Sequence, residues 1–175
     1  LPRVDAAVRQ IRQSAGRRSV SLTTFASFAS MWLIPRLEAF QRDHPDIDIR
    51  IDASDAALDL EMADVDIALR YGPPATMPAS ALRLFGEQLT PVASPWLLKG
   101  AKTLASAADL ARFTLIEAGD VRNRNFQILA WQRWFDTFQK DRIQPKRWLY
   151  FDYAYQMVQA AIAGQGVVLA RMPLI

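Results

Sequence analysis

Residues 21–45 read SLTTFASFASMWLIPRLEAFQRDHP, and the expected fold is built around this stretch. It begins in a β-strand over residues 20–24, where β-favouring residues dominate. It continues as a helix, because apolar residues recur at helical spacing in Leu33, Leu37 and Phe40. A strand that leads directly into the positive end of a helix is a natural site for an anion or a carbonyl group.

Polar residues mark the two ends of this predicted helix. Ser27 and Ser30 are the expected helix starters, because a serine oxygen can accept a hydrogen bond from a first-turn amide. His44, beside Pro45, is interpreted as a cap of the helix end or a surface residue, since cations are favoured there. Trp32 either packs in the core or lines a cleft beside the strand–helix junction.

The composition is that of a globular protein, with 51% hydrophobic and 22% charged residues in a chain of 175. The net charge is +3, and the lysines and arginines are spread along the chain, so they are read as solvation rather than as a nucleic-acid surface. The absence of cysteine excludes disulfides and agrees with a cytoplasmic location. No apolar run reaches the ~18 residues of a membrane span, and the chain start lacks the apolar core of a signal peptide.

Strand and helix patterns alternate along the chain. This alternation predicts two α/β halves with mainly parallel sheets, joined by an extended crossover. Ser94 is expected to cap a short helix with Pro95 at its first position. The turn Gly164-Gln165-Gly166 is expected to end the last helix and lead into the last strand. The expected strands cover 20–24, 47–53, 64–72, 82–93, 113–117, 146–151 and 167–170, and the expected helices cover 1–15, 28–42, 58–62, 94–98, 105–112, 125–141 and 153–163.

No catalytic constellation is visible in the sequence. Asp64 and Asp66 are interpreted as residues that flank a strand rather than as paired catalytic carboxylates. The aromatic face of the helix 125–141, with Phe126, Trp134, Phe135 and Phe138, is read as core packing rather than as a stacking platform. Because no nucleophile, base or metal-ligand cluster can be assembled, we expect a binding module without catalytic residues, metal or cofactor.

Four blocks of the sequence carry a likeness to a known family. Residues 27–47 resemble the start of the effector-binding domain of LysR-type transcriptional regulators, in the branch that contains the glycine-cleavage activator and the β-lactamase regulator. Residues 64–72 (DVDIALRYG) are similar to the third strand of that branch, residues 84–95 to its first crossover, and residues 159–170 to its late helix and strand. The likeness covers nearly the whole chain in order.

The resemblance implies a periplasmic-binding-protein-like α/β fold, with two subdomains around a ligand cleft. Residues 1–16 would be the end of a linker helix, residues 17–88 regulatory subdomain I and residues 89–175 regulatory subdomain II. The DNA-binding domain and a C-terminal return segment are expected to be missing, which leaves the fold C-terminally incomplete. The family also implies a homodimer or tetramer that pairs through the helix Phe28 to Arg42 and the neighbouring strand, with DNA bound only through the missing N-terminal domain.

The strand ends and the resemblance together predict a ligand site. Ligands of open α/β sheets bind outside the carboxyl ends of strands, and the family's effector-contacting serine or threonine matches Ser27. A small polar or anionic effector is expected there, and closure or rotation of the subdomains would change the oligomer geometry. The candidate ligand-binding residues are Ser27, Phe28, Ser54, Tyr71, Gly72, Asp152 and Tyr153.

Other interpretations stay open at this point. Each serine can cap a helix or form a turn as well as bind a ligand, and Asp152 is expected first as the N-cap of the helix that follows it. A solute-binding protein of a transport system is the alternative function, although a signal peptide would be expected. A third possible function is an enzyme, such as a deaminase, on a two-lobed fold. The absence of a recognisable base and nucleophile argues against it.

Overall fold

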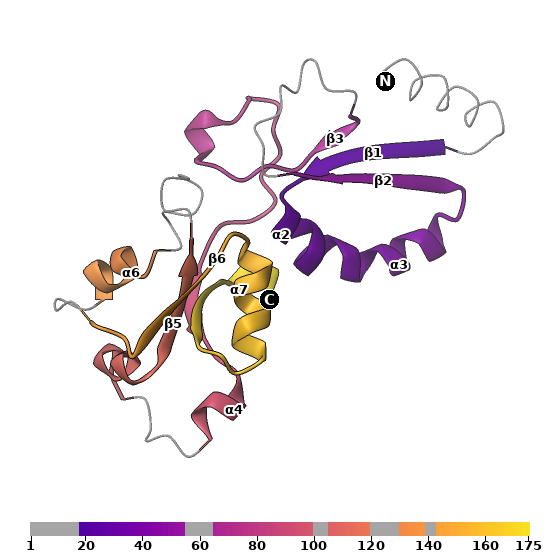
Figure 1. Ribbon diagram of the computed structural model, residues 1–175. Coiled ribbons are helices and arrows are strands. Elements are labelled where there is room, and N and C mark those ends of the chain that lie inside the picture. Colours follow the sequence, from indigo (N-terminus) through magenta and orange to yellow (C-terminus); the bar gives the residue numbers. More distant parts are fainter. Residues whose placement is uncertain (1–17, 55–64, 100–104, 120–129, 139–142) are drawn as a thin grey trace. The chain divides into compact units, whose positions relative to one another are not determined.

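The computed structural model describes residues 18–54, 65–99, 105–119, 130–138 and 143–175 (Figure 1). The chain forms two compact units, unit 1 over residues 1–76 and unit 2 over residues 77–175, and each is described by itself. Residues 77–88 contain no helix or strand. The helices expected over 1–15 and 58–62 lie outside the described residues.

Unit 1 contains a three-stranded parallel sheet in the order β2-β1-β3. The strands are β1 (Arg18–Thr24), β2 (Ile47–Ala53) and β3 (Ile67–Ala68). The first two match the prediction, and β3 is much shorter than the expected strand 64–72.

Asp66 joins the start of β3 to the central strand. Its carboxylate accepts hydrogen bonds from the Ser21 amide at 2.7 Å and from Ser21 Oγ at 2.8 Å, and its own amide donates to Ser21 O at 2.9 Å. The interpretation of Asp66 as a residue that flanks its strand is therefore confirmed, whereas Asp64 lies outside the described residues.

The helix after β1 has three parts. It comprises α2 (Ala26–Phe28), a π-helical turn (Ala29–Leu33) and α3 (Ile34–Asp43). The π-helical turn comes just before Pro35, which has no amide hydrogen and whose ring would clash with the carbonyl four residues earlier in a regular α-helix. The wider turn accommodates the proline ring without ending the helix.

The predicted serine caps of this helix were wrong, and the histidine cap is confirmed. The N-cap is Phe25, without a side-chain hydrogen bond, because the helix begins at Ala26 and so places Ser27 inside the first turn. At the other end His44 is the C-cap: its amide donates to Phe40 O at 2.9 Å, and its ring lies 4.7 Å from the Phe40 ring.

Unit 2 contains a four-stranded sheet in the order β4-β7-β5-β6. The strands are β4 (Leu89–Val92), β5 (Thr114–Ala118), β6 (Arg147–Phe151) and β7 (Val167–Arg171). β7, β5 and β6 are parallel, as expected, and β4 runs antiparallel to β7 at the edge. The segment expected to be extended over residues 82–93, with interruptions near Gly86 and Pro91, forms a strand only in β4, and Pro91 lies inside that strand. An edge strand tolerates a proline because one side needs no amide donors.

Helices cover both faces of this sheet (Figure 1). On one face, α7 (Ala154–Ile162) packs Met157 against Ile116 and Val168. On the other, α6 (Trp131–Phe138) and a 3-10 helix (Ala107–Arg112) enclose a core with Leu115. A short helix, α4 (Pro95–Leu98), follows β4.

The local predictions for unit 2 were mostly correct. Ser94 caps α4 as predicted, since its hydroxyl accepts from the Trp96 amide at 3.3 Å. Gly164, with φ of 77°, ends α7 in the left-handed conformation. The aromatic face of α6 was only partly right: Phe135 is buried but Phe138 is exposed, and the most buried ring belongs to Trp131, which the predicted face omitted.

Candidate functional site

The strands of unit 1 all end at one edge of the sheet, because they are parallel. Ser54, the first residue after β2, donates its amide hydrogen to Thr24 O at 2.9 Å. Leu69, the first residue after β3, donates to Thr23 O at the same distance. The carboxyl ends of the strands are thus joined side by side, in the position where ligands of α/β sheets bind.

The predicted ligand residues of unit 1 follow these strand ends. Ser27 is buried in the first turn of α2, Ser54 follows β2, and Tyr71 and Gly72 follow β3, all three half-buried. The half-buried Phe28 stacks on Trp32 of the π-helical turn, with ring centroids 5.0 Å apart.

Trp32 takes part in a column of side chains on the helix. Its ring lies between Phe28 and the guanidinium of Arg36, which sits 4.6 Å from the ring centroid and donates to Trp32 O at 2.9 Å. Trp32 is half-buried, so it packs against the helix's own side chains without being a fully buried core residue.

Thr24 is a polar residue at this edge that was not among the predicted ligand-binding residues. It is the last residue of β1 and only 1% exposed, yet its hydroxyl has no hydrogen-bond partner. A buried hydroxyl without a partner is unfavourable by about 1–3 kcal/mol, and such groups in native structures need an explanation. The signal available in the sequence was its position at the end of a predicted strand.

Arg70 brings a positive charge to the same edge. Its Nη2 donates to Thr23 Oγ1 at 2.8 Å, its Nη1 donates to Leu69 O at 3.2 Å, and its guanidinium lies 5.6 Å from the centroid of the Phe25 ring. These contacts hold a planar cation in a defined orientation, a geometry suited to carboxylate or phosphate groups. Arg70 was quoted in the sequence block 64–72 but not identified as a site residue.

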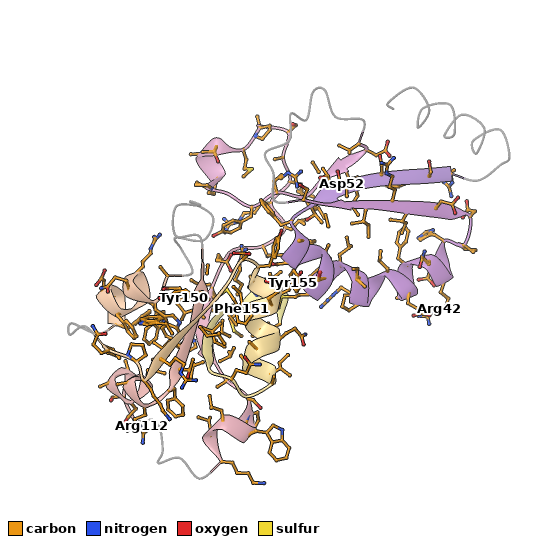
Figure 2. The ribbon with its side chains drawn as sticks, viewed as in Figure 1. Arg42, Asp52, Arg112, Tyr150, Phe151 and Tyr155 are labelled. Carbon is orange, nitrogen blue, oxygen red and sulfur yellow. The ribbon has the colours of Figure 1, made fainter. Side chains whose placement is uncertain are left out.

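In unit 2 the three parallel strands also end at a common edge. Gly119, just after β5, donates its amide hydrogen to Phe151 O, the last residue of β6, at 2.8 Å. Asp152 and Tyr153 follow β6 and are exposed, and the Tyr153 ring stacks on that of Tyr155 with centroids 5.6 Å apart. Figure 2 shows Tyr155 on α7 and Phe151 on β6.

The prediction that Asp152 is the N-cap of α7 was wrong. The N-cap is Tyr153, which makes no side-chain capping bond. The helix begins one residue later than expected, so Asp152 lies outside the capping position and its carboxylate does not serve the first-turn amides.

Glu117 is a half-buried carboxyl group on β5. Its Oε1 accepts a hydrogen bond from the Trp131 backbone amide at 2.8 Å, which fixes the start of α6. Burial raises the pKa of the Glu117 carboxyl above its ordinary value of 4.5, because desolvation outweighs the opposing hydrogen bond from Trp131. The folded unit therefore favours the protonated carboxyl.

A Glu117→Gln substitution is expected to stabilise unit 2 more at neutral than at acid pH. Because the pKa of Glu117 is higher in the folded state, this carboxyl stabilises the wild-type fold fully at a pH below its unfolded-state pKa near 4.5. That stabilisation is lost as the pH rises through the folded-state pKa. Glutamine keeps an acceptor for the Trp131 amide but cannot ionise. Urea unfolding of both proteins at about pH 4 and about pH 7 measures this; a larger advantage of glutamine at the lower pH would contradict the assignment.

Within the described residues, no group of three or more His, Cys, Asp or Glu side chains is placed to hold a metal ion. No helix in that part of the chain is long and apolar enough to cross a membrane.

Comparison with known proteins gives the family. Residues 13–174 match the family model described as the LysR substrate binding domain. The chain belongs to the LysR substrate-binding domain family. The LysR relatives include the glycine cleavage system transcriptional activator of Escherichia coli K12, 35% identical over 165 residues that cover 94% of this chain and 52% of the relative. They also include the transcriptional activator AmpR of Pseudomonas aeruginosa, 34% identical over 155 residues, with 88% and 49% covered.

Solved LysR structures confirm the fold class. The effector domain of the transcriptional regulator AmpR of Pseudomonas aeruginosa matches with a TM-score of 0.62 and 32% identity, covering 90% of this chain and 71% of that structure. The predicted branch and the periplasmic-binding-protein-like fold with mainly parallel sheets are thereby confirmed. The relatives are transcriptional regulators rather than enzymes or transport proteins. This chain spans about half the length of the curated relatives it matches.

Proposed function

We propose that this chain is the effector-sensing part of a cytoplasmic LysR-type transcription regulator. Membership of the LysR substrate-binding domain family is the observation that carries the proposal. The effector is a small polar or anionic metabolite, and DNA is bound by a separate N-terminal domain. In this scheme residues 1–16 belong to a linker helix, residues 17–88 to subdomain I and residues 89–175 to subdomain II.

In this proposal, effector contacts come from the carboxyl edge of the sheet in each unit, and each unit is considered by itself. On unit 1 the contacts come from Ser27, Phe28, Ser54, Tyr71 and Gly72. The free hydroxyl of Thr24 supports a polar ligand, and the oriented guanidinium of Arg70 supports a ligand with an anionic group. On unit 2 the contacts come from Asp152 and Tyr153, which are exposed at the end of β6.

A Thr24→Val substitution is expected to weaken effector binding about tenfold, because it removes a buried hydroxyl that the ligand would satisfy. A thermal-shift screen of polar and anionic metabolites against the full-length protein identifies the ligand, and calorimetry measures its affinity for the variants. Ser27→Ala and Ser54→Ala are expected to weaken binding as well. Ser30→Ala, an exposed serine on the same helix, is the matched control. A ligand whose affinity survives all three site substitutions would contradict the proposed site.

We further propose that the helix Phe28 to Arg42 and β2 pair two copies of the chain. None of the residues of α3 is buried, and its large apolar side chains Ile34 and Phe40 are exposed. A Phe40→Glu substitution is expected to shift the full-length protein toward smaller species in sedimentation, because a charge is placed where an apolar contact is expected. Phe138→Glu, an exposed phenylalanine of unit 2, is the control. An unchanged sedimentation profile for Phe40→Glu would rule this surface out.

A further inference from the structure

Glu87 and Arg171 form a largely buried ion pair in unit 2. Arg171 Nε donates to Glu87 Oε2 at 2.7 Å, and Arg171 Nη2 donates to the same oxygen. Their side chains are only 16% and 18% exposed, respectively. The second carboxylate oxygen, Glu87 Oε1, is buried without a hydrogen-bond partner. Desolvating both charges is costly, so the pair needs a structural reason.

The position of the pair supplies that reason. Glu87 lies two residues before β4 begins, and Arg171 is the last residue of β7. The two strands are antiparallel with Leu89 opposite Arg171, and the Met172 amide donates to Gln88 O at 2.9 Å. The ion pair therefore closes the end of the β4–β7 ladder at which the chain arrives from unit 1.

The segment before Glu87 is exposed, whereas the Glu87 side chain is largely buried. The chain passes from unit 1 into unit 2 after Thr76, and residues 78–86 are all exposed and form no helix or strand. Glu87 is the first side chain after this connector to be largely buried in unit 2. Since β4 has four residues and is an edge strand, its own ladder is short.

We propose that the Glu87–Arg171 pair is a clamp that ends the exposed connector and fastens β4 to β7. With the clamp in place, bending is confined to residues 78–86, and β4 moves with the rest of unit 2. Without it, β4 peels away from the sheet edge, and a displacement of the connector no longer reaches the core strands. The other ion pairs among the described residues are more exposed and cannot take this role, since exposed pairs contribute little.

Hydrogen–deuterium exchange of the full-length protein tests the clamp. Glu87→Gln and Arg171→Gln are each expected to raise exchange of the β4 amides and of Met172 about tenfold or more, while the amides of β5 keep their protection. The double substitution is expected to have no larger effect than the stronger single one, because both remove the same interaction. Unchanged exchange in the single variants, or effects that multiply in the double variant, would overturn the proposal.

A second set of variants separates the clamp from general damage. Arg112→Gln removes the more exposed pair with Asp109 in the same unit and is expected to leave β4 exchange unchanged. If a single variant does not fold, exchanging the two charges (Glu87→Arg with Arg171→Glu) is expected to restore folding and the protection of β4. Failure of the exchanged pair to do so would overturn the proposal.

Discussion

Replacing Trp131 with alanine is expected to lower the free energy of unfolding of unit 2 by about 3–5 kcal/mol. The side chain is 0% exposed and packs with Leu115, Phe135 and Leu169 in one core cluster. Its ring stacks on Phe135 at 5.5 Å, and its Nε1 donates a hydrogen bond to Ile116 O at 2.9 Å. Alanine would leave a cavity and remove the side-chain hydrogen bond to Ile116 O.

Urea unfolding followed by circular dichroism measures this loss. Trp96→Ala is the matched control, because Trp96 is 73% exposed and its loss is expected to change stability by about 0.5 kcal/mol or less. Trp131→Phe is expected to fall between the two, since it keeps an aromatic ring but loses the bond to Ile116 O. Equal stability of Trp131→Ala and Trp96→Ala would contradict the packing of α6 on the sheet through Trp131.

Replacing Gly166 with alanine is expected to destabilise unit 2 by about 2–3 kcal/mol. Gly166 comes immediately before β7, and a Cβ atom there would lie 2.6 Å from Thr114 O and 3.0 Å from Ile116 Cγ1. The nearest atom belongs to the backbone of the adjacent strand β5, so it cannot move aside without disturbing the β5–β7 pairing. Chemical denaturation of the variant measures the effect.

Gly164 provides the control for this prediction. A Cβ atom at Gly164 would meet nothing within 4 Å, and the expected cost of Gly164→Ala is only the strain of its φ of +77°, about 1 kcal/mol. If Gly164→Ala were more destabilising than Gly166→Ala, steric contact with β5 could not be the reason that glycine is needed at position 166.

Several elements could be predicted because their signals are local. The strands β1, β2, β5, β6 and β7 and the helix α7 were expected close to their observed bounds, since side-chain periodicity and turn residues lie within each segment. For the same reason, Ser94 begins α4 and Gly164 ends α7 as predicted. The four sequence blocks over residues 27–47, 64–72, 84–95 and 159–170 also identified the LysR family that the comparisons show.

Other predictions failed on helix boundaries and on burial. The serines expected to cap the first helix do not, because the helix begins at Ala26, just after β1, and Ser27 lies buried in its first turn. The prediction for α6 named the wrong buried ring. Trp131 is buried because it packs against strands β5 and β7, and this packing cannot be seen in the sequence of the helix itself.

The sequence alone determined the order of strands and helices, the parallel α/β class and the family, because each depends on periodicity, turns and short sequence blocks. Only the tertiary structure decided which side chains matter within that frame. Thr24 is identified by a buried hydroxyl without a partner, and Gly166 by the approach of β5. The Glu87–Arg171 pair joins residues 84 positions apart. Burial and contact between distant segments arise only when the chain folds, so no local pattern encodes them.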